Sequence, residues 1–127
     1  MTPRPKSLVK VAERVLSAGG GFLAELADFL DDFRIAPAAA LRDEPPRLAG
    51  KLERGAWMDA YLAASGEFLA AKHGLANPAW ALDPSRSLDG PVFACRSKEG
   101  RVFLLKDAPA AFKSRNLFVS ANALDRV

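Results

Sequence analysis

The sequence predicts a compact all-α domain of about five to six helices that spans residues 1–127 as a single domain. Apolar residues recur at helical spacing in three separate stretches, and clusters of glycine or proline separate these stretches. The composition is 50% hydrophobic and 26% charged, which is typical of a globular domain rather than a disordered chain. A chain of this length can also bury a core of its own.

Two amphipathic helices are predicted before residue 37. The first starts after Pro5 and ends at the three glycines 19–21, because glycine disfavours a helix interior. The second runs through Phe33 and is closed by Pro37. Their apolar stripes follow the 3, 4 and 7 residue spacing of one helix face. The stripes are Leu8, Val11, Ala12, Val15 and Leu16 in the first helix, and Phe22, Leu26, Phe29 and Phe33 in the second.

The longest predicted helix covers about residues 52–73 and should form the centre of the bundle. Residues 38–42 allow one helical turn before it, and Pro45-Pro46 breaks that turn. Gly74 is expected as the left-handed residue that ends the long helix, with Leu75 packing back onto it. The side chains expected in the core are Leu26, Phe29, Phe33, Trp57, Tyr61, Phe68 and Phe112.

The segment 92–106 is ambiguous between a short helix over 98–106 and a β-hairpin of two strands. We favour the helix, because an isolated two-stranded hairpin has marginal stability in water.

The last twenty residues are expected to form two short helices with an extended joint between them. Asp107 should cap the first, which holds Pro109 in its first turn. Asn116 should stop it in the left-handed conformation, and residues 117–119 should form the buried joint. Ser120 should then cap a final helix that ends at Leu124.

Three features indicate a cytoplasmic protein without a membrane partner. No apolar run approaches the ~20 residues that cross a bilayer. Lys10, Glu13 and Arg14 interrupt what would be the apolar region of a secretion signal. Cys95 is the only cysteine, so an internal disulfide is impossible, as fits a reducing compartment.

The charge is unevenly distributed. Residues 1–18 carry four bases and one acid (net +3), residues 19–90 seven bases and eleven acids (net −4), and residues 91–127 seven bases and three acids (net +4). Solvated faces can differ in this way by chance. Alternatively, the basic ends meet an acidic partner, either a protein or a nucleic acid.

No catalytic residue, cofactor site or metal site is predicted. His73 is the only histidine, and its place in the last turn of the long helix is explained by the helix dipole. Cys95 is expected to act as a small hydrophobic residue. The bases of segment 91–127 alternate with Phe93, Phe103, Phe112 and Phe118, a pattern that could grip single-stranded nucleic acid, although such phenylalanines are usually core residues.

The motifs "AAKHGL", "PAW", "PVF" and "DAPAAFKSRNLFVSANALDRV" resemble a group of small bacterial proteins without an established activity. The resemblance covers about residues 52–127 and is most specific in the last 20. Members of the group are encoded beside nucleotidyltransferase-like proteins, in pairs that resemble toxin–antitoxin modules. The resemblance implies that this chain is the small partner, an antitoxin-like subunit. The chain departs from helix-turn-helix antitoxins because it has no convincing recognition helix.

Together these observations favour a non-enzymatic protein-interaction subunit that binds a nucleotidyltransferase-type partner encoded nearby. The alternatives are a nucleic-acid-binding regulator that uses the basic N- and C-terminal segments, and a small enzyme without a recognisable motif. Trp80, Lys113 and Arg115 are the candidate partner-contact residues. For Trp80, an anchor in the core is the favoured alternative to an exposed contact.

Overall fold

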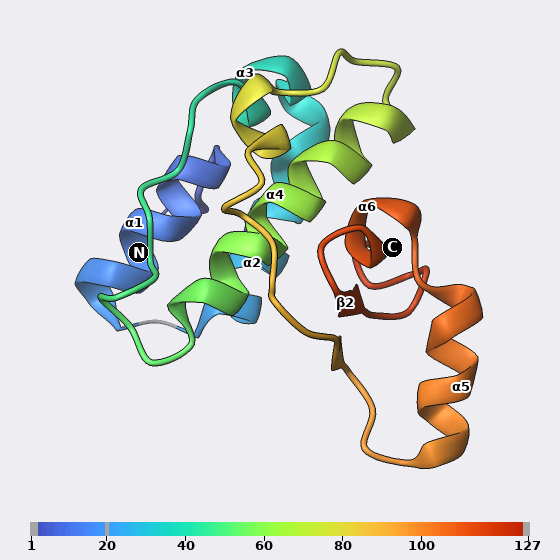
Figure 1. The fold of residues 1–127 in the computed structure, drawn as a ribbon. Coiled ribbons are helices and arrows are strands. Elements are labelled where there is room, and N and C mark those ends of the chain that lie inside the picture. Colours follow the sequence, from blue (N-terminus) through green and yellow to red (C-terminus); the bar gives the residue numbers. More distant parts are fainter. Residues whose placement is uncertain (1–2, 20, 126–127) are drawn as a thin grey trace.

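The computed structural model describes residues 3–19 and 21–125, and it is mostly helical, as the sequence predicts (Figure 1). Gly20, one of the three glycines expected to end the first helix, lies outside the described residues, as do residues 1, 2, 126 and 127. The described α-helices are α1 (Leu8–Ala18), α2 (Phe22–Asp32), α3 (Pro37–Arg42), α4 (Gly55–Lys72), α5 (Lys98–Asp107) and α6 (Ala110–Lys113). The remaining elements are the 3-10 helices η1 (Phe33–Ile35) and η2 (Ala79–Leu82) and the strands β1 (Val92–Phe93) and β2 (Leu117–Phe118).

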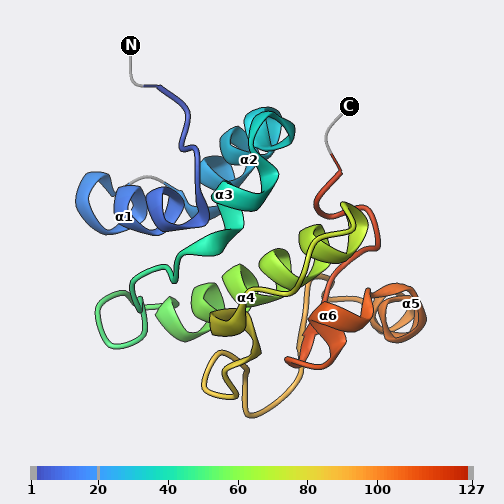
Figure 2. The same cartoon turned by 90° about the horizontal axis from the view of Figure 1, so that it is seen from above.

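Helix α4 is the centre of the fold. Helices α1 to α3 lie on one side of it, and η2 and α6 lie on the other (Figure 2). Its middle section, residues 59–66, is buried throughout, which is typical of a helix covered on all sides. This section is rich in alanine and also contains Gly66, where an added Cβ would lie 3.3 Å from the Trp80 ring. Small side chains therefore allow close packing of α4 against its neighbours.

Aromatic rings join the two sides of the core. Phe22 of α2 contacts Trp57 and Tyr61 of α4, each with ring centroids 5.6 Å apart. Tyr61 in turn meets Phe112 of α6 at 5.2 Å. Burial raises the pKa of Tyr61. All seven expected core residues are in the core or packed against it, with Trp57 and Phe68 only partly buried.

The predicted helix ends are confirmed at two glycines. Gly19 ends α1 in the left-handed conformation, with φ of 66°. Gly74, with φ of 68°, follows α4, and the Leu75 N–H donates to the Ala70 carbonyl at 2.7 Å. This bond from Leu75 is the one that defines a Schellman motif.

The long helix begins later than predicted, at Gly55 instead of near residue 52. The preceding residues form a turn, in which Gly50 adopts a φ of 82°. Asp59 stabilises this turn, because its carboxylate accepts the N–H groups of Leu48 and Ala49 at 2.8 and 3.1 Å. Pairing these N–H groups with a side chain one helical turn into α4 fixes the turn against the start of that helix.

The helix favoured over residues 98–106 is confirmed as α5, and the alternative hairpin is absent from the described residues. Strand β1 instead pairs in parallel with β2, with Val92 opposite Leu117. The Phe93 and Phe118 rings stack at 4.7 Å over this short ladder. The extended segment 117–119 therefore pairs with β1, a partner that the sequence did not indicate.

The structure corrects both N-caps predicted for the last twenty residues, Asp107 and Ser120. Pro109 is the N-cap of α6, and Asp107 instead accepts the N–H of Ala121 at 2.9 Å. Ser120 precedes two consecutive turns rather than a final helix. The N–H groups of Ala123 and Asp125 each donate to the carbonyl three residues earlier. Asn116 has the predicted left-handed conformation, with φ of 65°.

Over residues 3–19 and 21–125, no helix is both long and apolar enough to span a bilayer.

Candidate interaction surface and pocket

Helix α5 projects from the edge of the molecule (Figures 1 and 2). It carries exposed apolar side chains. Ser97 caps it by accepting the Gly100 N–H at 3.0 Å, and Leu104 is its buried residue. The neighbouring Val102, Phe103 and Leu105 are 50%, 58% and 50% exposed. Val102 points nearly opposite to the buried Leu104, with Phe103 and Leu105 on either side of it, because successive helical residues are about 100° apart. Single exposed apolar residues are ordinary, but an apolar patch that wraps the exposed side of a projecting helix is of the kind that partners cover.

Basic residues surround this patch. Lys98, Val102 and Lys106 succeed one another at four-residue spacing and therefore share one face of α5. Arg101 lies beside them, with its guanidinium 5.8 Å from the centre of the Phe93 ring. We call Val102, Phe103 and Leu105, with Lys98, Arg101 and Lys106, the α5 face. It combines an apolar centre with exposed positive charge.

Of the three candidate contact residues, Lys113 lies next to the α5 face. Its ammonium is 3.4 Å from the Lys106 carbonyl at the end of α5, and its side chain is partly exposed. The expectation that Arg115 is exposed is wrong, because only 6% of it is accessible. Its guanidinium binds Glu67 at 2.6 Å and the Ala81 carbonyl at 2.5 Å, which joins α6 to α4 and η2.

Trp80 is in the core, as favoured from the sequence. It is 9% exposed, and its indole N–H donates to the Leu41 carbonyl at 2.9 Å. Trp80 therefore anchors η2 to α3 and is not available as an exposed contact.

The exposed position of Phe103 differs from the expectation that the C-terminal phenylalanines belong to the core. Phe112 is buried, and Phe93 and Phe118 are half-buried against each other. Residues 102–105 form a run of four apolar residues on α5, and a helix that packs along one edge can bury only one side of such a run. That run is the sequence signal that indicates an exposed patch.

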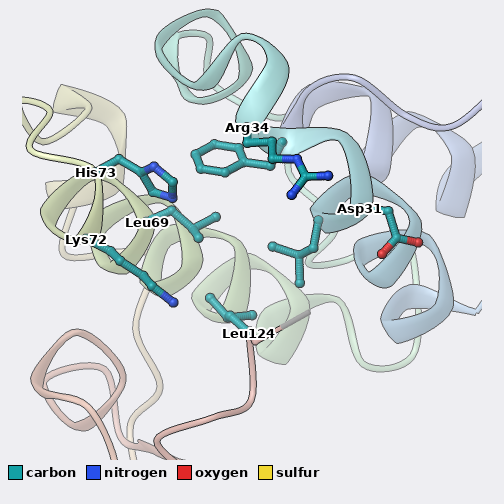
Figure 3. Close-up of a pocket in the computed structure, with 8 residues that line it drawn as sticks. Asp31, Arg34, Leu69, Lys72, His73 and Leu124 are labelled. Carbon is teal, nitrogen blue, oxygen red and sulfur yellow. The ribbon is translucent and has the colours of Figure 1, made fainter. Parts of the chain in front are cut away.

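A hollow of about 200 Å³ lies between α2 with η1 and the end of α4 (Figure 3). Its apolar floor consists of Leu30, Phe33, Leu69 and Leu124, and its polar rim of Asp31, Arg34, Lys72 and His73. We call this hollow the α2–α4 pocket. His73 meets Phe33 edge-on at 4.9 Å, and Lys72 pairs with Asp125 at 3.3 Å. At this pocket the only histidine lies near Asp31, Arg34 and Lys72.

A second hollow, of about 220 Å³, is bordered by the buried Arg86 and Arg115. Glu67 and Asp83 line it as well. Glu67 pairs with Arg115, whereas Arg86 pairs with Glu44 and lies near Asp59, and Asp83 pairs with Arg47. Hydrogen bonds from Ser85 lower the pKa of Asp83, which keeps that carboxylate charged. Both arginines bind backbone carbonyls, so this cluster supports the fold.

The described residues contain no group of three or more His, Cys, Asp and Glu side chains that could hold a metal ion. His73 is exposed, and the described residues that line the α2–α4 pocket include no serine, threonine or cysteine that it could activate as a nucleophile.

Cys95 lies half-buried at the start of α5, with its Sγ 3.3 Å from the Ser97 hydroxyl. The hydrogen bond from Ser97 is the main cause that lowers the pKa of this thiol, and Arg101 adds to the effect. Cys95 therefore has a polar neighbour that the sequence did not indicate.

Alkylation of Cys95 by iodoacetamide should follow a pH profile displaced to lower pH than that of a model thiol. A lowered pKa leaves the reactive thiolate populated at lower pH. Replacing the hydroxyl in Ser97→Ala should move the profile back to higher pH, whereas Ser97→Thr should keep it. Identical profiles for all three proteins would show that Ser97 does not control the thiol.

A scan against protein-family models, a search of curated proteins and a search of solved structures each found no match to this chain.

Proposed function

We propose that this protein is a non-enzymatic interaction subunit that docks its α5 face onto an acidic partner protein. The observation that carries the proposal is the exposed apolar patch of Val102, Phe103 and Leu105 on a helix that projects from the core. The resemblance of residues 52–127 to small proteins encoded in toxin–antitoxin-like pairs supports an antitoxin-like role against a nucleotidyltransferase-type protein. The single cysteine is consistent with a cytoplasmic complex.

The patch can contribute useful binding energy. Complete burial of a valine, leucine or phenylalanine side chain is worth about 1.5–3 kcal/mol, and about half of each of these three remains to be buried. A partner that wraps the exposed side of α5 and covers all three would gain on the order of 3 kcal/mol. The remaining affinity would come from the surrounding contacts and from the partner's own side chains.

Charge selects the type of partner. Segment 91–127 has a net charge of +4, from seven bases and three acids, so two copies of the α5 face would repel each other. A partner with acidic side chains around an apolar groove would both attract this face and accept its three apolar residues. A heterologous acidic protein therefore fits the surface better than a second copy of this chain.

The test is co-expression with the product of the adjacent gene, followed by co-purification and a binding titration. Wild type should form a stable complex, and the triple variant Val102→Gln, Phe103→Gln, Leu105→Gln should bind at least about tenfold more weakly. The matched control is Leu23→Gln with Ile35→Gln, which removes exposed apolar residues elsewhere and should keep wild-type affinity. Circular dichroism should show that both variants remain folded.

Failure of the wild-type pair to co-purify would contradict the partner assignment. A complex that forms equally well with the triple variant would show that the α5 face is not the docking surface.

Nucleic-acid binding is the second candidate, and its specific support is the exposed Phe103 among the bases Arg96, Lys98, Arg101 and Lys106. The N-terminal bases offer less, because Arg14 pairs with Glu25 at 3.1 Å and Lys10 with Glu13 at 3.1 Å. Fluorescence anisotropy with single-stranded DNA and RNA at low salt should detect binding that weakens steeply as salt is added. An absence of binding at low salt would eliminate this candidate.

A further inference from the structure

We infer that the α2–α4 pocket binds a small carboxylate that carries an apolar group. The pocket presents two different surfaces to one ligand: the apolar floor of Leu30, Phe33, Leu69 and Leu124, and a rim that contains Arg34, Lys72 and His73. In Figure 3 the side chains of His73 and Lys72 come from one side and Arg34 from the other, with Leu69 and Leu124 between them. This inference does not depend on the function proposed for the α5 face.

Arg34 is the side chain best placed to hold the carboxylate. It is exposed at η1, and no hydrogen bond or ion pair engages it within the part of the chain that the structure describes. An arginine offers five N–H donors in a planar arrangement that matches a carboxylate. Arg34 therefore has its full binding capacity toward an anion.

Lys72 supplies the second positive charge, from the last turn of α4. Its ammonium pairs with Asp125 at 3.3 Å, and both side chains are about half exposed. Such exposed pairs contribute little, about 0–1 kcal/mol, so a ligand carboxylate can compete with Asp125 for this ammonium. Neither cation of the rim is therefore committed to the fold.

Asp31, the acidic residue of the rim, has a cationic neighbour of its own. Asp31 lies 3.9 Å from Arg4, and Figure 3 shows its carboxylate directed away from His73 and Lys72. The C-terminal ends of α2 and α4 also face this region and carry partial negative charge, which is a reason for cations to gather here. A bound carboxylate would therefore lie toward the ends of the Arg34 and Lys72 side chains, away from the helix carbonyls.

Size limits the ligand. The volume of about 200 Å³ is smaller than the roughly 300–1,000 Å³ typical of sites for drug-sized ligands. The apolar part must therefore be a short chain or a single ring, which the four apolar side chains of the floor can cover. Octanoate or an aromatic acid with a single ring has this combination of features.

The test is a titration of the full chain with octanoate, monitored through the NMR chemical shifts of its backbone amides. Saturable shifts should be confined to residues 30–34, 69–73 and 124. Octanamide, which has the same chain without the charge, should bind at least about tenfold more weakly. The double variant Arg34→Gln, Lys72→Gln should show a similar loss, whereas the exposed control Lys51→Gln should bind octanoate like wild type.

The inference would be overturned by no saturable shift with wild type at millimolar octanoate, by equal binding of octanoate and octanamide, or by unchanged binding by the double variant. Because Arg34, Lys72 and Lys51 are all exposed, none of these variants should alter the spectrum outside its own neighbourhood. A spectrum that reports binding only at the α5 face would equally contradict the inference.

Discussion

Replacing Arg86 with methionine should lower the free energy of unfolding by about 3 kcal/mol and the Tm by about 10 °C. Arg86 is completely buried and joins three segments. Its guanidinium donates to the Pro45 carbonyl at 2.6 Å and to Glu44 at 3.2 Å, and it lies 3.7 Å from the buried Asp59. Methionine retains an apolar stem against Trp80 but leaves Asp59 and the Pro45 carbonyl without their positive partner.

The size of the effect follows from two opposing contributions. Breaking a buried ion pair by removing one partner costs about 3–5 kcal/mol, because the other charge stays buried. However, burial lowers the pKa of Arg86, and its Nε and Nη1 atoms have no hydrogen-bond partner among the residues that the structure describes. Arg86 thus has a desolvation cost of its own, which places the expected loss at the lower end of that range.

Chemical denaturation of a double-mutant cycle measures the coupling. Asp59→Asn should be less destabilising in the Arg86→Met protein than in wild type, by about 1 kcal/mol or more. In wild type the substitution leaves the buried Arg86 without the Asp59 charge, whereas the Arg86→Met protein has no buried arginine to leave unpaired. Arg47→Met is the matched control, since Arg47 pairs with Glu44 and Asp83 at a partly exposed position and should cost at most about 1 kcal/mol. An Arg86→Met protein as stable as the control would show that this buried cluster does not hold the segments together.

The sequence was sufficient for the helical fold and most helix ends, because these depend on local patterns. The recurrence of Phe22, Leu26 and Phe29 reports one buried face of α2, and Gly19 and Gly74 adopt the left-handed conformation that ends α1 and α4. Asn116 has the same role after α6. Each of these predictions rests on residues separated by less than about two helical turns.

The errors occurred where partners are distant along the chain. Asp107 was expected to cap the next helix, but it binds Ala121, fourteen residues away. Arg86 and Asp59 gave no signal in the sequence, because a buried arginine looks like any exposed one until the segments that surround it are placed. The parallel pairing of β1 with β2 was missed for the same reason.

The two candidate sites differ in the same way, because one depends on a local sequence pattern and the other on residues that are distant along the chain. The apolar run at 102–105 contained the information for an exposed patch, once α5 is known to pack along one edge. In contrast, the α2–α4 pocket requires Arg34 and Lys72, which are 38 positions apart, to lie across one hollow. Only the packing of η1 against the end of α4 brings them together.

Replacing Gly55 with alanine should destabilise the protein by about 3 kcal/mol or more. Gly55 is the first residue of α4 and is buried. A Cβ there would lie 1.9 Å from the Leu48 carbonyl oxygen and 2.6 Å from the Ala49 nitrogen. These are backbone atoms, and Asp59 already fixes their N–H groups, so the turn cannot shift without losing those two bonds.

Urea denaturation monitored by tryptophan fluorescence would measure this loss, with Gly90→Ala as the control. Gly90 has open space around its Cα and no left-handed backbone, so alanine there should be neutral or stabilise by up to about 1 kcal/mol. Asp59→Asn should remove part of the same turn, so Gly55→Ala should cost less in that background than in wild type. Additive losses would mean that the turn and Asp59 act independently, contrary to the shared contacts at Leu48 and Ala49.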